Sequence, residues 1–202
     1  MARYTGPKIR LSRKFGEPLT PKAVKYLAKR NYRPGMHGQN RARISEYGMQ
    51  LREKQKAKAI YGILEKQFQR YYEKASKKVG VTGDSLLQLL ETRLDNAVYR
   101  LGFAQTRAQA RQFVTHGFFE LNGQKVNIPS HEVRVGDEIK VRDSKKNKPL
   151  IKGLLPVLAK AQPPDWLSLD HKNLTAKVLS LPSREQMEST INTQLVVEYY
   201  SR

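Results

Sequence analysis

The sequence predicts an α+β fold with three parts. These are a basic extended N-terminal arm over residues 1–44, a small helical domain over 45–82, and an inserted domain over 83–187 with its core at 93–157. In the inserted domain we expect two helices followed by a β-hairpin and further strands. The prediction depends on the charge of the first segment, on apolar residues at helical spacing in the next two, and on an Asn-Gly pair between two strand-like runs.

The arm carries much of the positive charge. The 202 residues include 38 Lys and Arg against 18 Asp and Glu, a net charge of +20, and residues 1–44 hold 12 of the basic residues and a single acid, Glu17. Prolines and few aliphatic side chains leave this segment little to bury, so we expect it to be extended alone and ordered on a partner. Tyr and Phe between the cations suit stacking on bases, so the expected partner is nucleic acid.

Composition also excludes several kinds of protein. The chain has no Cys, which excludes a disulfide framework and a thiolate zinc site. No apolar run approaches the roughly 18 residues of a membrane span, and the N-terminus lacks the apolar stretch of a secretory signal. The four His are scattered, and no nucleotide-binding loop or hydrolase motif is found. We therefore expect no metal, no cofactor, no membrane partner and no enzymatic activity.

In the helical domain, Ser45 is placed to cap a helix over residues 46–60, and Gly62 breaks the chain. A second, amphipathic helix follows around residues 64–72. The glycines at 80 and 83 then mark the domain boundary.

The inserted domain begins with a predicted helix over residues 84–101, ended by Gly102. Five apolar residues recur along it every three or four positions: Leu86, Leu90, Leu94, Val98 and Leu101. Thr106 and Gln109 form a capping box for a second helix over residues 107–116.

Strand-like runs at 118–121 and 124–128 flank Asn122-Gly123, which predicts a hairpin, and a further strand is expected at 139–141. Residues 150–160 suggest a short helix, and a turn at 163–167 leads to a possible strand. Trp166 is expected in the core, and the apolar segment 191–200 is expected to dock as a helix or a strand.

Two arginines on the second helix of the inserted domain suggest a binding face. Arg107 and Arg111 are one turn apart, and their planar guanidinium groups can each grip a phosphate. The alternative is two solvated arginines on a surface helix, and the spacing alone slightly favours that alternative. The order helix, helix, hairpin moves the RNA-binding interpretation ahead.

Several stretches of the chain resemble ribosomal protein S-four of the bacterial or organellar small subunit. They include Met1–Pro7, Asn31-Tyr-Arg-Pro-Gly-Met-His-Gly38, residues 45–56, residues 93–112 and Gln194–Arg202. The resemblance covers essentially the whole chain in order. Many members of that family bind zinc through a cysteine cluster near the N-terminus. This chain has no cysteine, so it resembles a zinc-free form.

The resemblance implies a partner and a place. Such proteins bind the 5′ domain of small-subunit rRNA at a multi-helix junction early in assembly, and they influence decoding accuracy. They neighbour other small-subunit ribosomal proteins near the mRNA entry side, which implies mRNA as a further partner. Their C-terminal segment, here 188–202, packs onto the helical domain. The implied location is the ribosome, in a bacterial cytoplasm or in an organellar stroma or matrix.

We expect three RNA-binding surfaces. The arm contributes Arg3, Tyr4, Lys8, Arg10, Arg13 and Lys14. The region around the first long helix contributes Arg33, His37, Arg41, Arg43, Tyr47, Gln50 and Arg52. The inserted domain contributes Arg107, Arg111 and His116. From the family's geometry we also expect Lys29, Arg41 and Arg43 to face mRNA.

Two alternatives use the same small RNA-binding domain. Arg93-Leu94-Asp95 resembles a motif of pseudouridine synthases whose Asp is catalytic, which would make the chain an RNA-modifying enzyme. The motif lies inside the leucine-striped helix, where Asp95 is expected to pair with a neighbouring Arg, and 202 residues leave no room for a separate catalytic domain. The other alternative is a ribosome-associated factor that acts outside mature particles.

Overall fold

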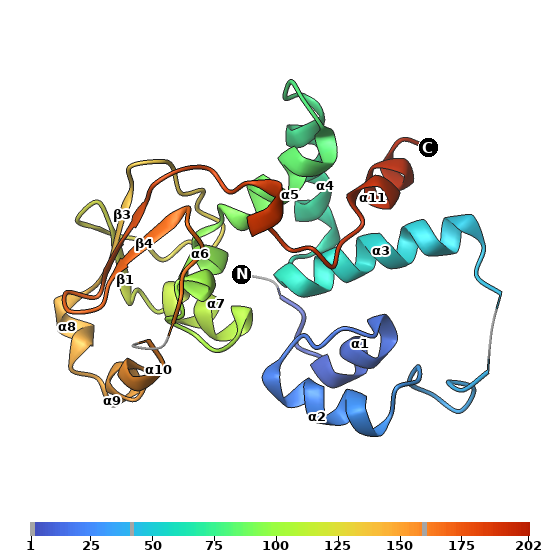
Figure 1. Cartoon of the computed structure of the whole chain (residues 1–202), viewed down its shortest axis with the longest axis horizontal. Coiled ribbons are helices and arrows are strands. Elements are labelled where there is room, and N and C mark those ends of the chain that lie inside the picture. Colours follow the sequence, from blue (N-terminus) through green and yellow to red (C-terminus); the bar gives the residue numbers. More distant parts are fainter. Residues whose placement is uncertain (1–2, 41–42, 159–160) are drawn as a thin grey trace. The chain divides into compact units, whose positions relative to one another are not determined.

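The computed structural model of the chain describes residues 3–40, 43–158 and 161–202, which form two compact units (Figure 1). Unit one comprises Met1–Leu86 and Ser189–Arg202, and unit two comprises Leu87–Glu188. Unit one is helical, whereas unit two combines helices with a five-stranded antiparallel sheet. The predicted α+β class is confirmed. Helix α5 (Thr82–Glu91) carries the chain from unit one into unit two.

Unit one is built around α3 (Glu46–Tyr61), α4 (Glu65–Ser76) and α11 (Thr193–Tyr200). The predicted cap is present, because the Ser45 hydroxyl accepts a hydrogen bond from the Gly48 amide at 3.2 Å. Gly62 ends α3 with a φ of 65°, a left-handed conformation that favours glycine. Helix α11 packs against α3, so the apolar C-terminal segment docks as a helix, as expected.

The expected extended arm is wrong over much of its length. Residues Lys8–Phe15 form α1 and Pro21–Lys29 form α2, two short helices that pack against each other. Phe15 and Ala23 are buried, and the buried Ser12 hydroxyl accepts a hydrogen bond from the Leu19 amide at 3.1 Å. The segment has few aliphatic side chains, but two short helices need only a few of them when α1 also packs on α3.

The single helix predicted over residues 84–101 is wrong, because the structure has two helices there. Helix α5 ends at Glu91 and α6 (Leu94–Arg100) begins three residues later. Between them the backbone pairs with the segment 129–133 instead: the Leu94 amide donates to the His131 carbonyl, and the Val133 amide donates to the Thr92 carbonyl, each at 2.8 Å. The apolar stripe continues across this break because both helices bury their leucines, so the spacing does not reveal it.

The sheet of unit two has the strand order β2-β1-β3-β5-β4. Its strands are β1 (Phe119–Leu121), β2 (Gln124–Lys125), β3 (Glu138–Val141), β4 (Leu167–Asp170) and β5 (Thr175–Val178). The predicted hairpin is confirmed, with Asn122 at φ 49° and Gly123 at φ 80° between β1 and β2. Strand β2 is shorter than expected.

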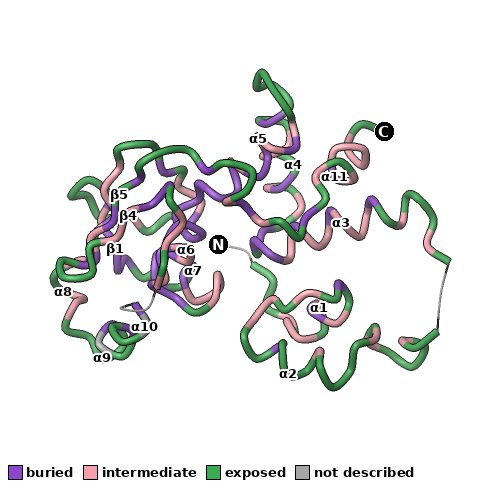
Figure 2. The backbone as a smooth tube through the Cα atoms, in the orientation of Figure 1, coloured by how far each residue is buried: buried purple, intermediate pink, exposed green. Residues whose placement is uncertain are grey.

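The core of unit two lies between the sheet and the helices α6 and α7 (Arg107–Thr115), where Figure 2 shows buried backbone. Trp166 is fully buried in this core, as predicted. The short helix expected over 150–160 is instead two single turns, α9 (Pro149–Lys152) and α10 (Leu155–Leu158), which follow α8 (Asp143–Lys146). A 3-10 turn, η1, spans Arg184–Gln186.

Candidate RNA interface

The first expected surface lies on α1 and the residues before it. The side chains of Arg3, Tyr4, Arg10 and Lys14 are exposed, so they are available to a partner. Lys8 is partly buried, and burial together with the positive charge of Arg3 lowers the pKa of its ammonium group. The structure keeps these cations on the surface.

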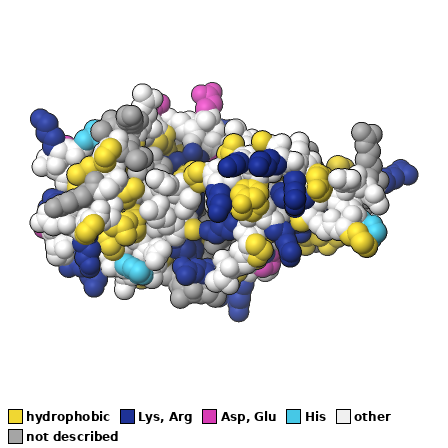
Figure 3. Space-filling model, turned by 90° about the horizontal axis from the view of Figure 1, so that it is seen from below, with side chains coloured by type: hydrophobic (Ala, Val, Ile, Leu, Met, Phe, Trp, Pro, Cys, Tyr) yellow, Lys and Arg dark blue, Asp and Glu magenta, His cyan; other side chains and the backbone are white. Residues whose placement is uncertain are grey.

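Helix α2 adds three exposed lysines, Lys22, Lys25 and Lys29. Figure 3 shows Lys and Arg side chains around hydrophobic ones on the face of unit one that α2 occupies. Of these three lysines, only Lys29 is predicted from the sequence to face a nucleic acid. The three-residue and four-residue spacing of the lysines would have shown the shared helix face, had the segment been predicted as a helix.

Two other predicted residues hold unit one together. The Arg13 side chain donates to the backbone carbonyls of Tyr32 and Arg33, at 3.2 and 3.3 Å, and its guanidinium lies 4.8 Å from the Tyr32 ring centroid. Arg52 donates to the Phe15 carbonyl at 3.2 Å, at the C-terminus of α1. Both arginines therefore fix the positions of the exposed cations near them.

The glycine-rich segment before α3 forms a tight turn. Gly35 has a φ of 106°, and a Cβ at Gly38 would collide with the carbonyl oxygen of Arg33, so position 38 requires glycine. The turn leaves the side chains of Arg33 and His37 exposed. Arg43 is also exposed, whereas the predicted site residue Arg41 lies outside the described residues.

The two predicted site residues on the first turns of α3 differ in their exposure to solvent. Tyr47 is exposed, with its ring centroid 5.8 Å from that of Tyr199, and a hydrogen bond with Tyr199 raises the pKa of the Tyr47 hydroxyl. Gln50 is only 2% exposed, and its amide donates to Glu198 on α11 at 3.1 Å. Gln50 therefore lies in the interior of unit one and joins α3 to α11, which corrects its assignment to an RNA-binding surface.

An exposed basic face on α4 and just beyond it is absent from the surfaces predicted from the sequence. Lys66, Arg70 and Lys77 are all exposed and lie four and seven residues apart, so they share one side of the helix. The opposite side buries Phe68 and Ala75. That regular spacing in the sequence was a signal for this face.

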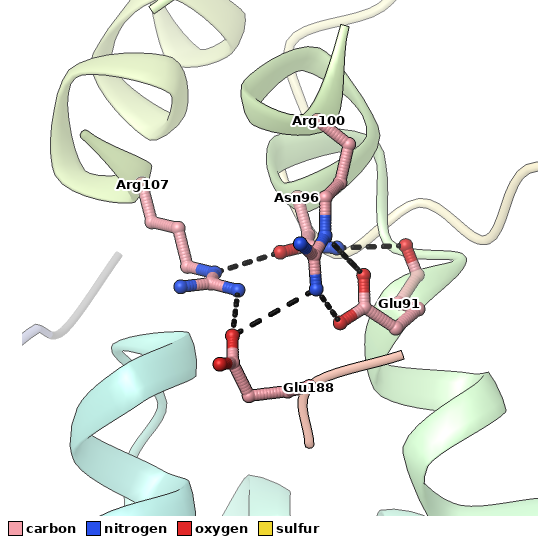
Figure 4. A network of polar contacts seen from close by, with 5 residues as sticks. All are labelled: Glu91, Asn96, Arg100, Arg107 and Glu188. Carbon is pink, nitrogen blue, oxygen red and sulfur yellow. Dashed lines mark hydrogen bonds and ion pairs between the residues drawn. The ribbon is translucent and has the colours of Figure 1, made fainter. Parts of the chain in front are cut away.

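In unit two, Arg107 belongs to a network of ion pairs (Figure 4). Its Nε donates to Asn96 and its Nη2 to Glu188, both at 2.8 Å. The Asn96 amide donates to Glu91, and Arg100 makes two hydrogen bonds to the same carboxylate, at 2.9 and 2.7 Å. The guanidinium of Arg107 thus joins α7 to α6 and to the segment around Glu188.

Arg111 is buried in a second ion-pair cluster. Arg93 makes a bidentate contact with Asp95, at 3.0 and 2.8 Å, and the Arg111 Nη1 lies 3.4 Å from the same carboxylate. Arg93 and Asp95 are 1% and 4% exposed, and Arg111 is 8% exposed. As expected, Asp95 pairs with neighbouring arginines. The structure does not bring Arg107 and Arg111 together as two solvent-facing forks.

His116, the third predicted residue of this domain, is exposed just after α7. It lines a groove with Lys145 and Lys148 rather than a common face with Arg111. Among the described residues, no three His, Asp or Glu side chains come together as metal ligands do. Within the same residues, the helices are all too short or too polar to cross a membrane.

Comparison with known proteins connects both units to one family. Residues 3–91 match the model of the ribosomal protein S4/S9 N-terminal domain, and residues 92–139 match that of the S4 domain. The chain is 53% identical to small ribosomal subunit protein uS4 of Heliobacterium modesticaldum, and 51% identical to the protein of the same name from Pelotomaculum thermopropionicum. Both matches cover the full length of each chain.

The chain belongs to the uS4 family. Members of the uS4 family are rRNA-binding structural components of the ribosome and not enzymes, so the catalytic interpretation of Asp95 is wrong. A buried carboxylate with two arginine partners accounts for the Arg93-Leu94-Asp95 motif as a structural element.

Proposed function

We propose that this chain is a structural component of the small ribosomal subunit that binds rRNA mainly through unit one. The observation that carries the proposal is the set of exposed cations on α1, α2 and α4, in a chain of the uS4 family. Contacts between these cations and RNA phosphates release counterions, which supplies affinity. The shape of the folded RNA supplies specificity.

Order within unit one supports the same proposal. Arg13 and Arg52 each donate to backbone carbonyls, so the helices that carry the exposed cations are held in place before binding. A binding surface that is already ordered loses less conformational entropy on association. This favours recognition of one folded RNA over non-specific attraction to any polyanion.

The finer assignment is that the bound RNA is a helical junction in the 5′ domain of small-subunit rRNA, contacted early in assembly beside other small-subunit proteins. We further propose that Lys29, Arg41 and Arg43 face mRNA at the entry side, where they contribute to decoding accuracy. The exposed side chains of Lys29 and Arg43 support this assignment. The chain then acts on ribosomes, in the cytoplasm if its source is a bacterium.

Binding to rRNA fragments of the separate domains, measured as a function of salt, tests the proposal. We expect tight binding to the 5′-domain fragment alone, with log K falling by roughly 0.7–0.9 per phosphate contact for each unit of log salt. The purified chain should also sediment stoichiometrically with small subunits after a high-salt wash. Salt-independent affinity would contradict the electrostatic account, and loss of the chain in the wash would favour a transient ribosome-associated factor.

The mRNA assignment has a separate test. Ribosomes that carry Lys29→Gln and Arg43→Gln should unwind a structured mRNA more slowly than ribosomes that carry Lys172→Gln and Lys177→Gln, two exposed cations of unit two. Equal unwinding rates would exclude this contact and leave the rRNA assignment in place.

A further inference from the structure

Unit two has a groove that the ion-pair networks do not use. It is about 830 Å³ in volume and lies where the C-terminus of α7, the start of β1 and the turns α8 and α9 meet. Its lining residues are His116, Phe118, Lys145, Lys148, Pro149 and Leu150. Figure 3 shows hydrophobic side chains next to Lys and Arg side chains on the side of unit two where α8 and α9 lie.

The rim of the groove is strongly positive. None of its six lining residues is acidic, and the charges of Lys148, Arg142 and Lys125, together with burial, lower the pKa of Lys145. The acids near it have other partners. Asp143 pairs with Lys140 and Lys146, and Glu120 pairs with Arg142. A bound anionic group would therefore reduce the repulsion between Lys145 and Lys148.

The floor of the groove is apolar. Pro149 is exposed, and Leu150, a large apolar side chain, is 50% exposed beside it. The Phe118 ring is held by Phe113, with ring centroids 5.2 Å apart, and Lys145 Nζ lies 5.5 Å from the Phe118 centroid. An apolar floor beside a cationic rim fits a ligand with a flat ring and an attached negative charge.

We propose that this groove binds an unpaired nucleotide of small-subunit rRNA, with the base against Pro149 and Leu150 and the phosphate between Lys145 and Lys148. His116 lies at the same groove and can donate a hydrogen bond to the nucleotide. This inference rests on the proposed function and deepens it, because it places an RNA contact on unit two away from Arg107 and Arg111. An acidic peptide would satisfy the charges but would leave the apolar floor without a flat partner.

The test compares two charge-matched double variants of the full chain in binding to the 5′-domain rRNA fragment. Lys145→Gln with Lys148→Gln removes two charges at the groove, and Lys172→Gln with Lys177→Gln removes two exposed charges elsewhere in unit two. The groove pair should bind about tenfold more weakly and lower the salt slope by about 0.7–0.9, as expected for one lost phosphate contact. The control pair should bind as the unaltered chain does.

A second measurement tests the base contact. Chemical probing of the bound rRNA should show one or a few unpaired bases that the unaltered chain protects and that Leu150→Ala exposes, with little change in the salt slope. Equal losses of affinity in both double variants, or unchanged protection in Leu150→Ala, would overturn the groove assignment. If the groove pair binds rRNA normally and instead weakens incorporation of a neighbouring protein, the groove binds protein, which also overturns it. Failure of the unaltered chain to bind the fragment would contradict the proposed function itself.

Discussion

The two units use their cations in opposite ways. In unit one, most Lys and Arg side chains of α1, α2 and α4 are exposed. In unit two, Arg93, Arg100, Arg107 and Arg111 each contact a carboxylate of the same unit. An arginine in a basic RNA-binding protein is therefore not by itself evidence for a phosphate contact. It can bind a phosphate only if a carboxylate of the protein does not already occupy its guanidinium group.

The supply of acids explains the contrast. Residues 1–80 contain 21 Lys and Arg against five Asp and Glu, whereas residues 81–202 contain 17 against 13. An arginine inside unit two must have a carboxylate partner, because burial of an unpaired charge is very costly. The surplus cations of unit one are exposed to water, so they keep their hydration until a polyanion binds.

The largest effect should follow from breaking the buried pair of unit two. Asp95→Ala leaves the buried Arg93 and Arg111 without their shared carboxylate, so we expect a loss of about 3–5 kcal/mol in the free energy of unfolding. Urea denaturation followed by circular dichroism measures it. Asp143→Ala, which removes an exposed carboxylate with two lysine partners, is the control and should hardly move the midpoint. Equal midpoints for the two variants would contradict the role assigned to Asp95.

A smaller effect on stability is expected at Glu65 in unit one. Its carboxylate has three internal hydrogen-bond partners. Lys54, Lys58 and Tyr200 all donate to its carboxylate, at 2.7–2.8 Å. Burial raises its pKa, but these hydrogen bonds outweigh burial and lower the pKa from 4.5 to about 2. Burial, together with the hydrogen bond to Glu65, raises the pKa of the Tyr200 hydroxyl.

Because the pKa of Glu65 is depressed in the folded state, its contribution is full above about pH 4.5 and is lost as the pH falls toward about 2. Glu65→Gln should cost about 1–3 kcal/mol at pH 7, since the buried Lys54 loses its ionic partner. The difference from the unaltered chain should shrink as the pH falls through that window. Glu73→Gln, an exposed change on the same helix, should show no such pH dependence.

Arg107 gives a sharper test of the contrast between the units. Arg107→Gln loses a partly exposed ion pair with Glu188, so we expect a loss of about 0.5–1.5 kcal/mol in stability. If Arg107 also contacts rRNA, affinity should fall together with the salt slope. Arg134→Gln, at an exposed arginine of unit two, is the matched control. A charge reversal at Arg111 is a poor probe of binding, because it would place two carboxylates together in the core.

The smallest effect on stability is expected on α1. Arg10→Gln with Lys14→Gln should leave the unfolding midpoint unchanged, since both side chains are exposed. Affinity for the rRNA fragment should nevertheless fall, and the salt slope should drop by about 1.5 for two lost phosphate contacts. A lower midpoint with unchanged affinity would reverse the comparison between the two units.

Local signals in the sequence predicted much of this architecture. Ser45 and Thr106 each accept the expected cap hydrogen bond, and the Asn122-Gly123 turn lies between two paired strands. Such features depend on residues three or four positions apart, which a sequence shows directly. The Gln109 side chain differs in detail, because it accepts from the Gln105 amide rather than from that of Thr106.

The errors come from contacts between distant residues. The break at Thr92 and Arg93 depends on pairing with residues 129–133, and the partner of Arg107 lies 81 positions away. Gln50 is polar and follows the exposed Met49, yet its amide donates in the interior to Glu198, 148 positions away. A sequence lists these groups but does not say which of them meet, so the internal contacts of Gln50, Arg107 and Arg111 could not be predicted from it.

The docking of α11 on α3 has a consequence for biosynthesis. Helix α11 follows the whole of unit two in the sequence, although it packs into unit one through contacts such as Tyr200 with Glu65. All residues of unit two therefore leave a translating ribosome before α11 does, so unit two can finish folding while unit one still lacks a helix. Unit one contains the residues that are synthesised first, yet its fold is complete only after α11 has emerged. Its basic surface is therefore exposed close to the ribosome that made it.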